Sequence, residues 1–123
     1  MNGQALIIMM KMEMKYWKIV KDYYCSLILK RKKLCVNVAY IDIINSIFYG
    51  ENDPLTLSLK RKFKNYNIYV NDNTVYICGN GAYHLYEIPK IAKNFMKDYY
   101  SKSPVGPFKF SMKKFNSQPK QNR

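Results

Sequence analysis

The sequence predicts an α+β domain with a small antiparallel or mixed three-stranded sheet, packed helices, and basic extensions at both ends. Three observations favour this fold. A hairpin signal joins two β-rich runs, 74–78 and 82–88, helical periodicities stand before and after it, and lysine-rich segments lie on both sides. At 123 residues the chain has the length of one domain. Because a lone hairpin is marginal in water, helices or further strands are expected to pack against it.

The N-terminal part is expected to contain an arm and a helix. Residues 1–14 show no clear periodicity and are expected to form a loose arm. From Lys15 apolar residues recur every three to four positions, which predicts a helix that ends near Leu29. The cations that follow suit the negative end of a helix. They are Lys30, Arg31, Lys32 and Lys33. Solvent and phosphate groups are equally favoured as the surroundings of these charges.

The middle of the chain is expected to supply one helix and two more strands. Residues 34–38 read as a short strand, and 40–48 as a helix with isoleucines along one stripe. The Gly- and Pro-containing segment that follows ends that helix. Residues 55–63 alternate loosely and are predicted to enter the sheet as a strand. This strand carries a second basic cluster, formed by Lys60, Arg61, Lys62 and Lys64. A polar, turn-rich segment, 65–73, leads to the hairpin.

The hairpin is the clearest local signal in the chain. It turns at Gly79-Asn80-Gly81, residue types that accept the positive φ of tight connections. Alternation places Val75 and Ile77 on one face of the first strand and Tyr76 on the other. Pro89 then suits the first position of a further helix. The segment 103–107 ends that helix.

The C-terminal residues 110–123 are predicted to be a basic tail. Beyond Asp98 the chain has no acidic residue. Such a tail is expected to be disordered alone, to order only on a partner, and to add nothing to the sheet. Lys109 stands just before this tail, and the first cations within it are Lys113 and Lys114. The predicted organisation is therefore an arm (1–14), one RNA-binding domain (15–109) and the tail.

The charge balance favours a polyanionic partner. Lys and Arg number 21 against 8 Asp and Glu, which gives a net charge of +13. This excess opposes compaction unless an anion neutralises it, and nucleic acid is the usual one. A basic protein without a dedicated partner is the alternative. The three widely spaced cysteines, Cys25, Cys35 and Cys78, are expected to be small buried hydrophobes rather than a disulfide framework or metal site.

The sequence predicts a binding protein rather than an enzyme. The single histidine, His84, lies in a predicted strand without an obvious Ser, Cys or carboxylate partner, and no phosphate-binding or dinucleotide motif occurs. No metal or other cofactor is expected. Aromatic residues interleave with both lysine clusters and could stack on unpaired RNA bases, although a core position is favoured for Phe63 and Phe108.

Four pieces of the sequence, in order, resemble the S-nineteen family of small-subunit ribosomal proteins, and organellar members in particular. Tyr16-Trp17-Lys18 resembles the Trp-Lys segment before the family's first helix. Lys60-Arg61-Lys62 resembles its Ser-Arg-Arg box, and Tyr69-Val70-Asn71 the aromatic-Val-Asn segment beyond it. The run 74–81 resembles the strand and Asn-Gly turn of the family hairpin. The run 106–114 resembles the closing Gly-Glu-Phe-x-Phe-Thr-x-Lys block.

Some segments depart from the family pattern. Residues 35–57 would be an insertion between the first helix and the basic box, and 89–103 an enlarged link after the hairpin. Lys102-Ser103-Pro104 stands where family members carry Gly-His-Lys, and Pro107 replaces an acid. Contacts that depend on that His and that Glu are not carried over.

The resemblance implies a structural constituent of the ribosome that binds rRNA in the head of the small subunit, near the aminoacyl-tRNA site. The S-thirteen ribosomal protein would be its neighbour. The C-terminal tail would point toward tRNA and the large subunit. RNA contacts are expected from the three basic clusters, which are Lys30, Arg31, Lys32 and Lys33; Lys60, Arg61, Lys62 and Lys64; and Lys109, Lys113 and Lys114.

Two other functions stay open. One is a stand-alone basic nucleic-acid-binding protein of a virus or AT-rich genetic element, and the other is a protein adaptor that uses helix 40–48. The heavy use of Lys, Asn, Ile, Tyr and Phe is associated with organelle, viral or parasite genomes. No membrane span is expected, because the apolar run 5–10 is far too short, and a secretory signal is not expected either. An Arg-rich presequence is not expected, since the first arginine is Arg31. The resemblance to organellar members implies mitochondrial ribosomes as the location, and the cytoplasm otherwise.

Overall fold

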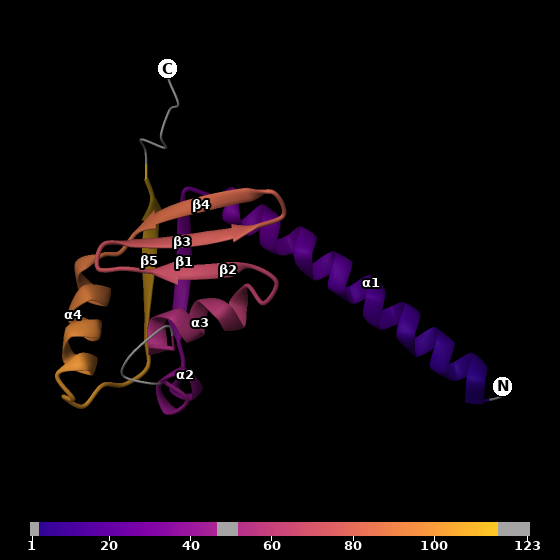
Figure 1. The fold of residues 1–123 in the computed structure, drawn as a ribbon, viewed down its shortest axis with the longest axis horizontal. Helices are drawn as coiled ribbons and strands as arrows, with labels where there is room; N and C mark the ends of the chain where they lie inside the picture. The colour runs from indigo at the N-terminus through magenta and orange to yellow at the C-terminus, as the bar shows by residue number, and fades with distance from the viewer. Residues whose placement is uncertain (1–2, 47–51, 116–123) are drawn as a thin grey trace, which may run out of the picture. The chain divides into compact units, whose positions relative to one another are not determined.

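The computed structural model describes residues 3–46 and 52–115. The chain divides into two compact units, residues 1–30 and residues 31–123. The helices are α1 (Gly3–Leu29), α2 (Tyr40–Ile44), α3 (Pro54–Lys62) and α4 (Lys90–Tyr100) (Figure 1). The strands are β1 (Lys33–Val38), β2 (Asn67–Val70), β3 (Thr74–Gly79), β4 (Ala82–Glu87) and β5 (Phe108–Lys114). The predicted α+β class is confirmed.

The first unit is formed by the helix α1, which is 27 residues long and so spans about 40 Å. The helix predicted from Lys15 to Leu29 is confirmed, but the loose arm is not, because the same helix already begins at Gly3. Ala, Leu, Met, Lys and Glu dominate its first half, and these are good helix formers. Several large apolar side chains of α1, among them Tyr16 and Trp17, are exposed. In the part of the chain that the structure describes, no helix is both long and apolar enough to cross a membrane.

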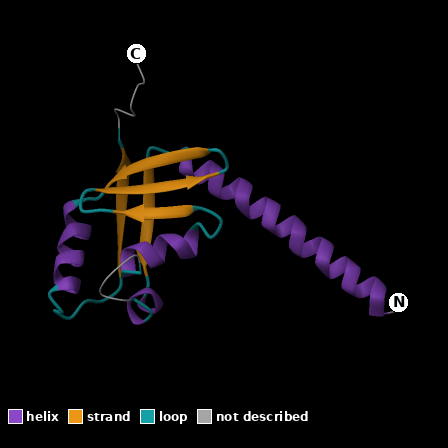
Figure 2. Ribbon diagram, viewed as in Figure 1, coloured by secondary structure: helices purple, strands orange, loops and turns teal. Residues whose placement is uncertain are grey.

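The second unit is built on a five-stranded sheet, with strand order β1-β5-β4-β3-β2 and antiparallel neighbours throughout. The contact between β4 and β5 is short, because only Tyr86 faces Lys114 and Glu87 faces Lys113. The sheet therefore consists of two ribbons, β1–β5 and β2–β3–β4, joined at one corner. Figure 2 shows these two ribbons running across each other, so the sheet is curled.

The predicted hairpin is confirmed as β3 and β4. Asn80 (φ 52°) and Gly81 (φ 73°) both have the positive φ that a two-residue turn of this kind requires. Gly79 is needed for another reason: a Cβ there would lie 2.4 Å from the ring of Tyr66. Val75 and Ile77 are fully buried while Tyr76 on the other face is exposed, as the alternation predicts.

Several of the sequence predictions about the second unit are wrong. The sheet has five strands instead of three: β2 forms within the segment 65–73, and most of β5 lies in the segment assigned to the tail. Residues 110–114 belong to β5, where Phe110 and Met112 are buried, so this part of the tail is core. The rest of the tail, residues 116–123, lies outside the described residues. The strand predicted at 34–38 is confirmed as β1; it lies mostly within the expected insertion 35–57 and pairs with β5 along its whole length.

Residues 55–63, predicted as a strand, are helical. Asp53 begins α3 as its N-cap: its carboxylate accepts hydrogen bonds from the backbone N–H and the hydroxyl of Thr56, and Pro54 occupies the first turn. Leu55 and Leu59 then lie one turn apart, and both are buried. The N-cap and the i, i+4 spacing outweigh the loose alternation that favoured a strand.

The core lies on the inner face of the curled sheet. Alternate residues of β1, β3 and β5 are buried there, and the helices add Leu55, Leu59 and Phe95. Phe95 of α4 stacks on Phe108 of β5, with ring centroids 4.4 Å apart. Each fully buried Leu, Ile or Phe side chain contributes roughly 1.5–3 kcal/mol relative to exposure. Tyr86 is buried at the corner between the two ribbons, and burial raises its pKa to about 12.

The helices that flank the sheet agree with the predictions in part. Pro89 is the N-cap of α4 rather than its first residue. The expected helix 40–48 is confirmed as α2 as far as Ile44, and residues 47–48 lie outside the described part of the chain. Ile41 and Ile44 of its expected apolar stripe are exposed.

Candidate nucleic-acid interface

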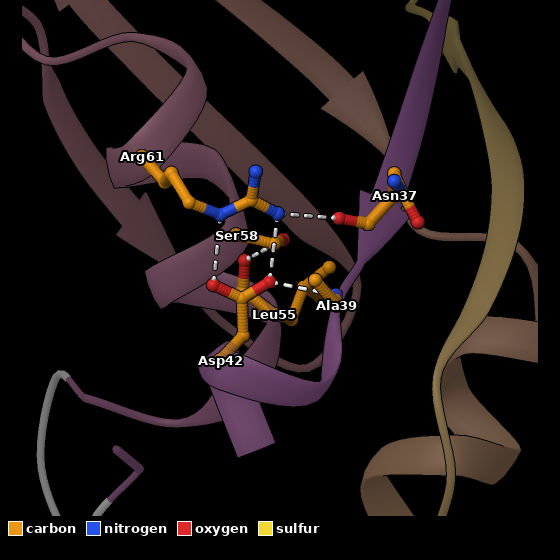
Figure 3. A network of polar contacts seen from close by, with 6 residues as sticks. All are labelled: Asn37, Ala39, Asp42, Leu55, Ser58 and Arg61. Carbon is orange, nitrogen blue, oxygen red and sulfur yellow. Dashed lines mark hydrogen bonds and ion pairs between the residues drawn. The ribbon is translucent and has the colours of Figure 1, made fainter. Parts of the chain in front are cut away.

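Arg61 of the predicted basic box makes contacts within the domain. Its Nε and Nη2 donate to the two carboxylate oxygens of Asp42, at 3.1 and 2.9 Å, and its Nη2 also donates to the carbonyl of Asn37 at 3.0 Å. Asp42 is 3% exposed and also accepts the backbone N–H of Ala39 (Figure 3). The hydrogen bond with Asp42 raises the pKa of Arg61. Arg61 thus ties α3 to α2 and β1.

Lys62 lies beside Arg61 on the same edge of the sheet. Its Nζ donates to the carbonyl of Cys35 at 2.9 Å. Strand β1 is the last strand on its side, so its outer backbone groups are not paired with another strand. Arg61 and Lys62 bind two alternate carbonyls along this edge. Both residues therefore have a structural role, which the sequence prediction of phosphate contacts did not include.

Lys60 and Lys64 flank a hollow at the opposite edge of the sheet. The hollow has a volume of about 230 Å³ and is lined by these two lysines and by residues of β2 and the turn before it, including Asn67 and Tyr69. Lys64 and Tyr69 are exposed, and Lys60 is half-buried. Since β2 is the last strand on this side, the two ammonium groups and an exposed ring border an open edge.

The lysines of β1 and β5 gather on the outward face of the ribbon β1–β5. Lys33 faces Lys113 across the two strands, and Asn37 faces Lys109. All three lysines are exposed. Between them Cys35 faces Ser111, with Sγ and Oγ 3.6 Å apart, so Cys35 is exposed and the expectation that it is buried is wrong.

This outward face, which we call the lysine face, is defined by Lys33, Lys109 and Lys113. It is hollowed by a groove of about 430 Å³ that Lys62 and Lys109 border. One carboxylate lies beside it, since Glu87 of β4 faces Lys113 from the other side. The structure therefore brings together lysines that are about 80 residues apart in sequence.

Lys114 points away from the lysine face. Its Nζ lies 3.1 Å from Nδ1 of His84 and 5.8 Å from the ring centroid of Tyr86. Partial burial lowers the pKa of Lys114. The pKa of His84 is lowered mainly by burial and in addition by the charge of Lys114. A neutral His84 that accepts at Nδ1 suits this contact, which makes both residues part of the corner of the sheet rather than an open phosphate site.

The first basic cluster spans the boundary between the two units. Lys30 is the last residue of the first unit, while Arg31 and Lys32 lead into β1. All three side chains are exposed. Lys33 of this cluster is the one that the structure places opposite another predicted cation, Lys113.

Most of the aromatic residues predicted near the lysines belong to the core. Phe63 is fully buried, as favoured from the sequence, and Tyr66 is buried with its hydroxyl accepting from Nδ2 of Asn80 at 3.0 Å. Phe108 and Phe110 stack on each other. Among the predicted aromatics Tyr69 is exposed, and two further rings of the same sheet, Tyr76 and Tyr83, are exposed as well. The alternation of β3 and β4 could have identified the last two, because it places them on the outer face of the hairpin.

Within the described residues no group of three or more His, Cys, Asp or Glu residues could hold a metal ion. A further hollow of about 400 Å³ lies between α4 and the β2–β3 turn, lined among others by Asp53, Asp72, Lys93 and Lys97. Its mixed charge does not favour a polyanion. Burial, followed by the nearby charge of Asp53, raises the pKa of Tyr100 at its rim.

Comparison of the chain with protein-family models, with curated proteins and with solved structures found no match.

Proposed function

We propose that this protein binds RNA and is a structural constituent of the small ribosomal subunit. The observation that carries the proposal is the lysine face, where Lys33 and Lys113 stand directly opposite each other on neighbouring strands. Like charges in this position destabilise a sheet. An anion bound between them removes that repulsion, and Glu87 offsets the charge on one side only.

The chemistry of the cations favours contacts with the phosphate backbone over recognition of bases. The exposed cations of this face are lysines, which act as compact point charges and lack the planar fork that reads base edges in pairs. A net charge of +13 on 123 residues needs a partner with many phosphates. RNA of the ribosome supplies such a partner.

The resemblance to the S-nineteen family supports a more specific placement. In that family the basic box, the hairpin and the closing block belong to a protein in the head of the small subunit, beside the S-thirteen protein and near the aminoacyl-tRNA site. The corresponding pieces here are 60–62, 74–81 and 106–114. We therefore place this protein in the head of a mitochondrial small subunit. Contacts of its C-terminal residues with tRNA or the large subunit belong to the same proposal.

Sedimentation of a native lysate tests the proposed function. The protein should migrate with small ribosomal subunits and stay with them through a high-salt wash, because a fitted site in the subunit adds contacts that do not depend on charge alone, whereas binding through phosphates alone is lost at high salt. Protein that is free or bound to DNA would instead support a stand-alone nucleic-acid-binding protein. Recovery with another protein after nuclease treatment would support an adaptor.

A further inference from the structure

We propose that the outward face of β2–β3–β4 binds unpaired RNA bases by stacking them on Tyr69, Tyr76 and Tyr83. We call these three residues the tyrosine row. The inference rests on the proposal that the protein binds RNA and adds to it a second surface, with a different chemistry from that of the lysine face.

The tyrosine row is continuous across three strands. Tyr69 of β2 faces Tyr76 of β3 in the antiparallel register. Tyr83 of β4 lies diagonally from Tyr76, and these two rings are nearly parallel, with centroids 5.5 Å apart and an interplanar angle of 28°. The side chains are 55%, 38% and 48% exposed, in the order Tyr69, Tyr76 and Tyr83. The row thus presents three partly exposed rings at neighbouring positions on one face of the sheet.

The core lies on the other side of these strands. The residues that alternate with the row, Ile68, Val75 and Ile77, are buried beneath it. Helix α3 contacts β2 and contributes Leu55 and Leu59 to this inner side. The tyrosines are therefore not needed to fill the core, and a rigid two-layer support holds them in place.

Cations lie at both ends of the row. Lys60 and Lys64 border the hollow that Tyr69 also lines. On the other side of the row, Leu85 of β4 lies opposite Tyr76. Glu87 is two residues further along β4, and Lys113 of β5 lies opposite Glu87. Stacking rings between lysines match a ligand that alternates flat bases with phosphates. This charge pattern favours single-stranded RNA over an acidic protein, which offers no series of flat rings.

The stacking explains why tyrosine suits these positions. Base–aromatic stacking tolerates every base, so the row is expected to bind without strong sequence preference. Removal of one ring is expected to weaken binding of single-stranded RNA by roughly 5- to 150-fold. The lysines proposed to contact phosphates are unchanged when a tyrosine is replaced, so the salt dependence of binding should not change.

Binding assays with the full chain test this inference. The probes are oligouridylate, an RNA duplex with the same number of phosphates, and inorganic polyphosphate as a ligand with charge alone. The variants are Tyr76→Ala and Tyr83→Ala, with Tyr76→Phe and Tyr83→Phe as matched controls that keep the ring. Thermal unfolding of each variant shows whether the sheet is intact.

We expect the alanine variants to bind oligouridylate at least about five-fold more weakly than the wild type. Their affinity for the duplex and for polyphosphate should change less than two-fold, and the phenylalanine variants should bind all three as the wild type does. If the alanine variants lose the same affinity for all three probes, stacking is overturned as the mechanism. It is also overturned if the phenylalanine variants lose as much affinity for oligouridylate as the alanine variants do. Recovery of a protein partner that depends on these rings, with oligouridylate binding unchanged, would overturn it in favour of a protein-binding face.

The two proposals fail in different ways. If the wild type binds oligouridylate and the alanine variants bind it equally well, the tyrosine row has no role but the protein still binds RNA. If the wild type binds neither RNA probe at physiological salt, the proposed function fails, and the inference fails with it.

Discussion

Asp42 and Arg61 form a two-pronged ion pair across 19 residues of sequence, with Nε–Oδ1 and Nη2–Oδ2 distances of 3.1 and 2.9 Å. The carboxylate is buried, whereas the Arg61 side chain is 44% exposed. The pair holds the short helix α2 against the end of α3. Arg61 and Lys62 of the basic box thus make contacts that stabilise the fold, whereas Lys60 and Lys64 border the hollow at the opposite edge of the sheet.

Arg61→Ala is expected to lower the free energy of unfolding by about 1–3 kcal/mol. In this variant the buried Asp42 carboxylate keeps the hydrogen bond from the Ala39 N–H but loses its cation. The loss of stability should be smaller than for a fully buried ion pair, because the Arg61 side chain is partly exposed to solvent. Denaturant unfolding measures the change. Lys64→Ala is the matched control, since it removes one exposed positive charge from the same region. An Asp42→Ala/Arg61→Ala double variant that is destabilised by the full sum of the two single effects would contradict a direct coupling.

Removal of β5 is expected to unfold the second unit. A chain cut after Lys109 has neither Phe110 nor Met112 in its core, and β1 is left without its only strand partner in the described sheet. A chain cut after Phe115 keeps every described strand and is the control. Far-UV circular dichroism during heating measures both. Equal melting temperatures would mean that β5 is not part of the folded core, as the sequence alone suggested.

The stability of the domain is expected to fall as the pH decreases from about 7 to 5 because of His84. Its pKa in the folded protein is lowered, chiefly by burial, from about 6.5 in the unfolded chain. The unfolded chain therefore binds a proton first as the pH falls below about 6.5, which favours unfolding. His84→Asn does not titrate in this range and keeps an acceptor near Lys114. The denaturation midpoint should therefore change less with pH in the variant than in the wild type. The same pH dependence in both proteins would show that His84 does not cause the loss of stability.

The two edges of the sheet are expected to respond differently when their cations are removed. Lys60→Ala/Lys64→Ala should leave the melting temperature nearly unchanged and should flatten the plot of log K against log salt by roughly 0.7 for each phosphate group that the variant no longer binds. Lys62→Ala should instead lower stability, because it uncovers the carbonyl of Cys35 on the open edge of β1. Filter binding and thermal unfolding of the two variants distinguish these roles. If the Lys60→Ala/Lys64→Ala variant is destabilised and its salt slope is unchanged, these two lysines stabilise the fold and do not bind phosphates.

The parts of the fold that could be predicted from the sequence are those whose signals are local. The Asn80-Gly81 turn and the alternation around it identify a hairpin because turn and strands are contiguous in the chain, from Thr74 to Glu87. Strand β5 has an equally regular alternation, Phe108-x-Phe110-x-Met112, but its lysines and its position near the end of the chain suggested a tail. Its partner β1 is about 75 residues away, and no local pattern encodes that pairing.

The site was predictable in composition but not in arrangement. Counting lysines favours a polyanionic ligand, yet it cannot distinguish Arg61, which has a buried acid as its partner, from Lys64, which is exposed. The missed helix α3 did carry a readable signal, the N-cap sequence Asp53-Pro54-Leu55-Thr56. The lysine face was not predictable, because it exists only once β1 and β5 pair.

The salt dependence of RNA binding shows whether the lysine face is a binding surface. The comparison needs the wild type, a Lys33→Ala/Lys109→Ala/Lys113→Ala variant, and a Lys90→Ala/Lys93→Ala/Lys97→Ala control that removes the same charge from α4. We expect the lysine-face variant to bind rRNA fragments more weakly and with a salt slope reduced by roughly 2. The α4 control should keep most of the wild-type slope. Equal slopes for the two variants would mean that net charge alone attracts RNA and that the lysine face is not a binding surface.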